Sequence, residues 1–192
     1  MLTLTLALLC AQEPYAPDAE GFIRNWLVLA PIPCESEANG AIEINAQQLK
    51  EEAKLAPKAG DKATANKTDL VWKEHQSAGY FIDFLASFGK ERGENVVGYA
   101  VAYVEAEADL DGLKVRVGSN DQCKVYLNGV QVLVFEEGRT LEKDSNEANV
   151  SLKKGRNVVV FKVLNEGNNW QGCLRFAGKD GAPLKNLKVS LK

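Results

Sequence analysis

From residue 96 onward short runs of β-branched and aromatic residues alternate with turn residues. Residues 113–118 (LKVRVG) alternate apolar and charged side chains, as a strand with one buried face does. Asn128-Gly129 and Gly155 stand between such runs, and both favour the positive φ of a tight hairpin. Short strands at roughly even spacing predict an all-β sandwich or barrel.

The N-terminal half is more mixed. Residues 22–33 begin as a strand and end at two prolines, which interrupt a ladder. Residues 45–55 are rich in Ala, Glu, Lys and Gln, so we expect one short helix there, with Asn45 as its N-cap. Residues 70–74 and 80–85 are typical of short strands. With no repeat and no linker, residues 12–192 are expected to form a single β-sandwich domain.

The first eleven residues are expected to be a signal peptide. Residues 2–10 form a short apolar run, and polar residues begin at position 12. The alternative is a buried first strand, because Thr and Leu alternate in this run. A cut near residue 11 predicts a secreted or periplasmic protein.

Charge and hydropathy exclude two classes of partner. Lys and Arg number 23 against 26 Asp and Glu, and the basic residues are spread out. A nucleic-acid surface needs a basic face or stripe, so we expect no nucleic-acid partner. No apolar stretch reaches the length of a membrane-spanning helix, and no membrane span is expected.

The cysteines match no zinc pattern. Once Cys10 leaves with the signal, Cys34, Cys123 and Cys173 remain, without a CxxC pair and with one histidine in the chain. Export permits disulfides. We favour a Cys123–Cys173 bridge because both residues lie within short predicted strands, which leaves Cys34 as the odd thiol. The alternative is three buried free thiols.

Six segments together resemble a known family. They are residues 26–33, residues 58–61 with 70–72, Tyr99-Ala100, residues 118–121 with 125–129, residues 154–157 with 161–163, and Trp170 with Arg175-Phe176. Their order is similar to that of galactose-binding-like jelly-roll domains attached to bacterial secreted glycoside hydrolases and other exported proteins. The resemblance implies a jelly-roll β-sandwich with an accessory role. It supplies no ligand, because that scaffold hosts varied partners.

Sandwiches of the resembling type often carry calcium, which takes six to eight oxygen ligands. Asn120 and Asp121 stand at a strand end beside Ser119 and are the candidate calcium ligands. The alternative is a turn in which these side chains bond their own backbone.

Aromatic residues near polar groups suggest a sugar site, because a flat ring can stack on the apolar face of a sugar. Trp170 and Asn169 lie in a polar loop, and Tyr126 has the opposite phase to Val125 and Leu127. These three are the candidate ligand-binding residues. The alternatives are that Trp170 folds back over the sandwich end and that Tyr126 packs under a loop.

No catalytic motif is present, and the chain is expected not to be an enzyme. It contains no GxSxG, HExxH or Walker sequence. His75 is interpreted as a solvated or capping residue. Acidic pairs occur at Glu35/Glu37, Glu105/Glu107 and Glu136/Glu137, and a polar outer face explains them better than a glycosidase pair.

The sequence therefore favours a non-catalytic secreted binding module that recognises a polysaccharide or glycan through loops at one end of the sandwich. The alternative is a structural or interaction protein with a protein partner, within an envelope or secreted complex, and with no small ligand.

Overall fold

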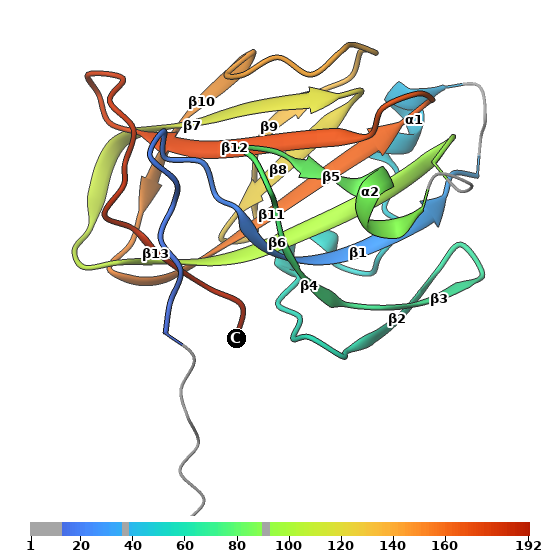
Figure 1. The fold of residues 1–192 in the computed structure, drawn as a ribbon, viewed down its shortest axis with the longest axis horizontal. Coiled ribbons are helices and arrows are strands. Elements are labelled where there is room, and N and C mark those ends of the chain that lie inside the picture. Colours follow the sequence, from blue (N-terminus) through green and yellow to red (C-terminus); the bar gives the residue numbers. More distant parts are fainter. Residues whose placement is uncertain (1–12, 36–38, 90–92) are drawn as a thin grey trace, which may run out of the picture.

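The protein is an all-β sandwich of two stacked sheets, as predicted (Figure 1). The computed structural model describes residues 13–35, 39–89 and 93–192. The expected signal peptide, Cys10 and Glu37 lie outside these residues. The helices that the structure describes are all too short to cross a membrane.

The larger sheet has seven strands and contains the longest pairings. Its order is β4-β1-β6-β11-β8-β9, with β13 pairing to β6. The central strands β6 and β11 pair antiparallel over eleven residues each. The seven strands are β1 (Asn25–Pro33), β4 (Lys73–Gln76), β6 (Val96–Ala106), β8 (Cys123–Leu127), β9 (Val130–Phe135), β11 (Gly155–Asn165) and β13 (Lys188–Ser190).

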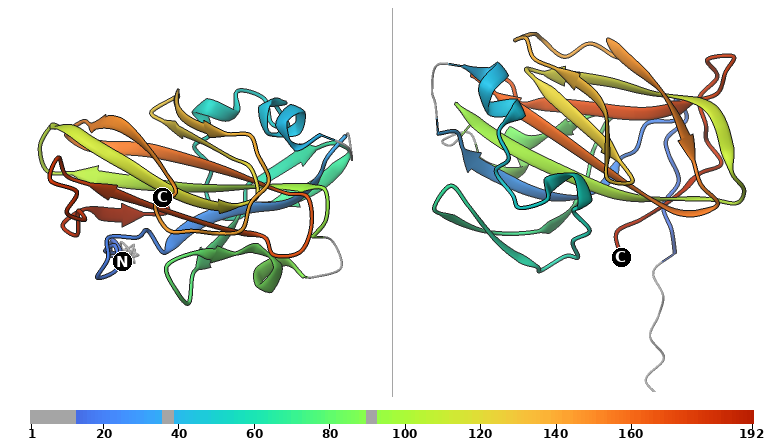
Figure 2. Two further views of the ribbon diagram at one scale, coloured as in Figure 1. Left: turned by 90° about the horizontal axis from the view of Figure 1, so that it is seen from above. Right: turned by 180° about the vertical axis from the view of Figure 1, so that it is seen from behind.

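The smaller sheet lies over one face of the larger one, as the view from above shows (Figure 2). Its order is β10-β7-β12-β5. Its strands are β5 (Ile82–Asp83), β7 (Leu110–Asn120), β10 (Asn146–Leu152) and β12 (Gln171–Ala177). A separate hairpin pairs β2 (Lys62–Ala65) with β3 (Thr68–Val71).

The core between the sheets is apolar. Trp26, Val117, Phe161, Leu174 and Phe176 are each no more than 1% exposed and belong to one cluster. These residues alternate along their strands with residues of the opposite face, which is the period-2 pattern that the sequence predicted.

The other face of the larger sheet is also buried. Residues 39–72 lie over it, and they include α1 (Gly40–Asn45) and the 3₁₀ turn η1 (Glu52–Lys54). A second apolar cluster forms there, in which Ile44, Leu49 and Trp72 pack against sheet residues such as Val160.

A buried ion pair joins this covering segment to the sheet. Lys162 on β11 is fully buried, and its Nζ donates to Glu52 Oε2 at 3.1 Å and to the Ala46 carbonyl at 2.5 Å. Tyr99 and Tyr126 each donate a hydroxyl hydrogen bond to the same Glu52 carboxylate at 2.5 Å. Burial lowers the pKa of Lys162 to about 8, and Glu52 opposes that shift.

Two local predictions were wrong. The expected helix at 45–55 is divided, because Asn45 ends α1 instead of capping it, and the chain re-forms only a single turn at η1. The cap of α1 is Asn39, whose side chain accepts from the Ile42 N–H at 3.1 Å. The expected strand at 80–85 shortens to β5, after which Asp83 caps a second helix, α2 (Phe84–Phe88).

The predicted hairpin turn at Asn128-Gly129 is confirmed. Both residues have positive φ, 52° and 82°, and they join β8 to β9. Near the ends of the described chain, Tyr15 and Val189 form an antiparallel bridge with two backbone hydrogen bonds of 2.7 Å. The first and last segments therefore lie side by side (Figure 1).

Candidate functional site

Several strands of both sheets begin or end at one edge of the sandwich, on the right of Figure 1. There β7 ends at Asn120, β8 begins at Cys123, β11 ends at Asn165 and β12 begins at Gln171. These strand ends and the loops between them carry the polar residues that the sequence proposed as ligand or calcium contacts, Asn120, Asp121 and Asn169. We call residues 119–122, 138–139 and 165–169 the Asp121 end.

Asp121 ties three loops together. Its Oδ1 accepts a hydrogen bond from the Arg139 N–H, and its Oδ2 accepts one from the Glu166 N–H, both at 3.0 Å. Burial raises the pKa of Asp121, and the backbone donors oppose this by favouring the carboxylate. The carboxylate is thus oriented by backbone groups and fixed relative to the loops.

Glu166 lies beside Asp121, and Gly138 leaves a small space between them. A Cβ on Gly138 would be 3.2 Å from Glu166 Oε2 and 3.5 Å from Asp121 Oδ1. The other oxygen of Glu166 accepts from Gln122 Nε2 at 2.8 Å. Two carboxylates therefore face one gap that a side chain at Gly138 would fill.

Three buried amide oxygens nearby have no hydrogen-bond donor among the described residues. They are Asn120 Oδ1, Gln122 Oε1 and Asn165 Oδ1, on side chains that are at most 6% exposed. A buried acceptor without a donor costs free energy, so each such atom is a candidate contact for a ligand, an ion or water.

The neighbouring loop supplies exposed amides. Asn168 and Asn169 are exposed, and together with Leu85, Gly93 and Glu94 they line an open hollow. Asn169 is therefore exposed at this hollow, and its contact with a ligand stays a prediction. Within the described residues, no group of three or more His, Cys, Asp or Glu side chains forms a metal site.

Trp170 does not belong to the exposed surface. It is 1% exposed, stacks on Phe84 with ring centroids 4.6 Å apart, and donates its Nε1–H to the Val163 carbonyl at 3.2 Å. The predicted sugar contact is wrong, because the ring folds back and closes the end of the core.

Tyr126 is also buried, at 7% exposure, and lies within the β8 strand instead of at a loop. Its opposite phase to Val125 is confirmed, but the covering segment 39–72 buries that face. Its hydroxyl donates to Glu52, so the predicted exposed platform is wrong.

The predicted disulfide is absent, since Cys123 and Cys173 are free thiols. Cys123 points into the core between the sheets. Cys173 lies between Gly172 and Leu174, and Leu174 faces that core, so Cys173 points to the opposite face of its sheet. Its sulfur would lie 3.0 Å from a Cβ on Gly118. Cys34 is a free thiol as well.

Three of the acidic residues that the sequence grouped in pairs have bonding partners. Glu105 pairs with Arg156 at 3.2 Å, Glu107 pairs with Lys188 at 3.3 Å, and Glu136 accepts from Asn45 Nδ2 at 2.5 Å. The sequence interpretation missed Glu166, Gln122 and Arg139. Glu166 lies in the same polar loop as Asn169, and that position could have marked Glu166 as a candidate site residue.

Comparisons with known proteins give structural similarity only. No protein-family model and no curated protein matches this chain. The PA14 domain of the MpAFP antifreeze protein is 11% identical, with a TM-score of 0.47 over 94% of this chain and 96% of that one. The PA14 sugar-binding domain from an RTX adhesin is 10% identical, with a TM-score of 0.44 over 88% and 100%.

A GH31 alpha-xylosidase from Xanthomonas citri is 11% identical, with a TM-score of 0.42 over 83% of this chain and 16% of that chain. All three TM-scores lie below 0.5, so no function is carried from these structures to this chain.

Proposed function

We propose that this protein is an exported, non-catalytic carbohydrate-binding module of the galactose-binding-like sandwich type, and that the Asp121 end binds the glycan. The observation that carries the proposal is the arrangement of Asp121 and Glu166. Two carboxylates are held around one gap by loops from both sheets, beside exposed amides of Asn168 and Asn169.

This set of groups suits sugar hydroxyls. A carboxylate accepts hydrogen bonds, and an amide both donates and accepts, so together they match the paired donor and acceptor character of a hydroxyl. Because two backbone donors already fix Asp121, binding a ligand costs no conformational entropy to orient this side chain.

We propose calcium as the ion at the same gap. Asp121 Oδ1 and Glu166 Oε2 flank the position that a Cβ on Gly138 would occupy, and the neighbouring Asn120 Oδ1 is a buried oxygen without a donor. Oxygen-only ligands of this kind are what calcium prefers. We propose that Asp121, Glu166 and Asn120 hold the ion, with water or sugar hydroxyls completing its coordination. The ion would neutralise the paired carboxylates.

The test is glycan-array binding and calorimetry with the full chain, in calcium and in EDTA. We expect binding that is lost in EDTA, and a rise in melting temperature with calcium alone. Asp121→Asn should weaken glycan affinity at least about tenfold, since a charged contact to a bound group contributes about 1.5–3 kcal/mol. The rise in melting temperature with calcium should also be smaller in this variant. Bound glycan should be recovered intact, as expected for a module that does not hydrolyse it.

Asp109→Asn is the matched control, because Asp109 is an exposed carboxylate on a different turn. It should bind like the wild type. If Asp121→Asn and Glu166→Gln bind glycans as tightly as the wild type does, the Asp121 end is not the site.

The alternative of a protein-interaction module would be favoured by a broad apolar surface. Among the described residues, the exposed large apolar side chains are Ile42, Val71 and Val130, which lie on α1, β3 and β9. No observation raises this alternative above carbohydrate binding.

A further inference from the structure

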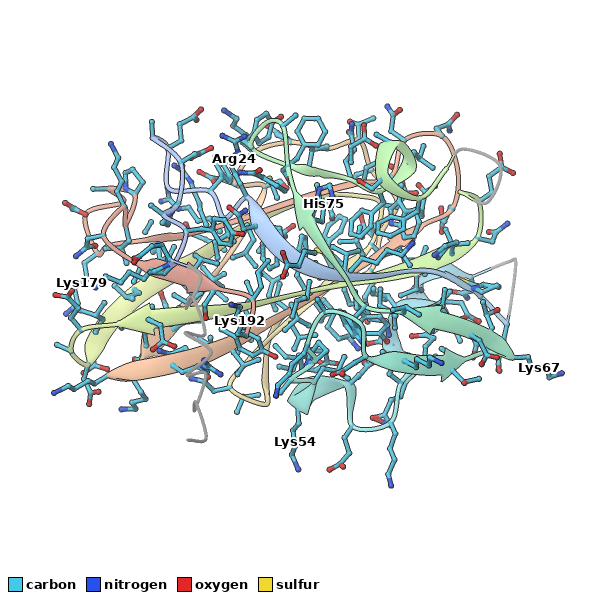
Figure 3. All side chains as sticks on the ribbon, turned by 60° about the horizontal axis from the view of Figure 1, so that its bottom comes forward. Arg24, Lys54, Lys67, His75, Lys179 and Lys192 are labelled. Atoms are coloured by element: carbon cyan, nitrogen blue, oxygen red, sulfur yellow. The ribbon has the colours of Figure 1, made fainter. Side chains whose placement is uncertain are left out.

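A second hollow, of about 310 Å³, lies between β4, the loop 77–81 and α2. Its lining includes His75, Gln76, Phe81, Asp83 and Ser87, which we call the His75 hollow (Figure 3 labels His75). Its size is within the lower range of small-molecule sites, about 300–1,000 Å³. None of these residues belongs to the Asp121 end.

We propose that the His75 hollow binds one pyranose ring of a neutral sugar, with Phe81 stacking against the sugar's apolar face and Asp83 and Gln76 bonding its hydroxyls. This second subsite is independent of the glycan site proposed at the Asp121 end.

The polar wall of the hollow is held in one arrangement. Ser87 Oγ donates to the Asp83 carbonyl at 2.8 Å, so its oxygen is left to accept from His75 Nδ1 at 3.1 Å. His75 Nε2 is then the acceptor for the Ser77 hydroxyl at 3.3 Å. Burial lowers the pKa of His75, so the imidazole is neutral at neutral pH. The wall therefore presents no cation to a ligand.

Two polar side chains in the hollow retain bonding capacity. Asp83 uses Oδ1 to accept from the Ala86 N–H at 3.0 Å, which caps α2, and no described residue bonds its Oδ2. Gln76 is exposed, and no described residue bonds its side-chain amide. A fixed carboxylate and a free amide are the groups that a pair of adjacent sugar hydroxyls requires.

The aromatic wall is what the Asp121 end lacks. Phe81 is half-buried and meets Tyr80 edge to face, with centroids 5.0 Å apart. Tyr80 is fixed in turn by Phe22 at 5.3 Å and by Lys143 Nζ at 4.2 Å from its ring centroid. The electron-rich face of a fixed aromatic ring attracts the C–H groups of a pyranose.

The Ser77 hydroxyl is hydrogen-bonded to the His75 imidazole, as a serine nucleophile is to its general base. Ser77 is 2% exposed, however, which keeps it from attacking a bound substrate. The pair is therefore assigned to positioning the wall and not to catalysis.

The experiment uses the only histidine of the chain as a reporter. Methyl pyranosides of galactose, glucose, mannose and N-acetylglucosamine are titrated into the full chain while the imidazole NMR signals are followed. We expect saturable shifts with at least one of these sugars. Phe81→Leu, which keeps apolar bulk without the ring, should weaken that binding about 3- to 10-fold.

Phe81→Tyr retains the ring and should bind like the wild type. Val71→Ala removes an exposed apolar side chain on another hairpin and is the matched control. Asp83→Asn keeps the helix cap, since Asn caps as well as Asp does, and should weaken binding without loss of folding.

The inference is overturned if none of the four pyranosides shifts the His75 signals, or if Phe81→Leu binds as the wild type does. Glycan binding that Asp121→Asn abolishes, without any shift at His75, would overturn this subsite alone and leave the proposed function intact. Shifts at His75 that persist in Asp121→Asn would support this subsite even if the Asp121 end binds nothing.

Discussion

Phe161 and Lys162 are neighbours on β11, both are fully buried, and they face opposite sides of the larger sheet. Phe161 points into the core that the smaller sheet covers. Lys162 points toward the covering residues 39–72. One face thus accommodates a plain aromatic residue, whereas the other contains a charged side chain with an acidic partner.

The difference follows from what covers each face. The backbone groups of the smaller sheet are hydrogen-bonded to one another in ladders. They therefore need no polar side chains from the larger sheet. In the cover of the other face, residues 46–61 form no strand and contain only the 3₁₀ turn η1, so their carbonyls need other donors once they are buried. Lys162 Nζ donates to the Ala46 carbonyl, and the Tyr103 hydroxyl donates to the Pro57 carbonyl at 2.5 Å. An irregular cover therefore requires polar groups from the sheet that it covers.

The largest expected effect is from Lys162→Met. Glu52 would then remain buried without its cation, which costs about 3–5 kcal/mol of unfolding free energy. The loss should shrink at mildly acidic pH, because the carboxylate can then take up a proton. Urea denaturation at neutral and acidic pH measures both effects. Lys154→Met, at an exposed lysine, should change stability little; equal losses in the two variants would contradict this account.

Leu174→Ala tests the other face. Leu174 is fully buried in the core between the sheets, and truncating such a leucine costs about 2–5 kcal/mol. Because no charge is involved, this loss should be the same at neutral and mildly acidic pH. A loss that depends on pH as strongly as that of Lys162→Met would remove the contrast between the faces.

The smallest effect is expected from Tyr103→Phe. It leaves the Pro57 carbonyl without its donor, which costs about 1–3 kcal/mol. If the covering segment depends on such donors, proteolysis within residues 39–72 should become faster than elsewhere. Uniform protection across the chain would show that this segment is held by its apolar contacts alone.

The strands were predictable because their signal is local. Alternation at 113–118 and the Asn128-Gly129 turn depend on residues close in sequence, and both gave the correct elements. The burial of Lys162 was not predictable in this way, since it depends on Glu52, which lies far away in the chain. The divided helix at 45–55 has the same origin, because tertiary contacts of Gln48 and Glu52 override local propensity there.

The candidate site shows the same limit. Asn120 and Asp121 could be placed at a strand end, and Asn169 in a polar loop, because strand ends and polar turns are visible in sequence. Trp170 and Tyr126 were wrongly predicted to be exposed, because the residues that contact them, Phe84 and Glu52, come from distant parts of the chain. The phase of Cys173 depends on which side of its strand faces the core, and its own short segment does not reveal this.

The bridge between Tyr15 and Val189 has a mechanical consequence. In an antiparallel pair, the outgoing chain ends leave from the same side, so tension applied through both ends would open the two 2.7 Å hydrogen bonds in succession, as a zipper opens. The load would reach β13 next and peel it from β6. Under traction the domain would therefore yield first at its edge, while the eleven-residue pairing of β6 with β11 stays unloaded.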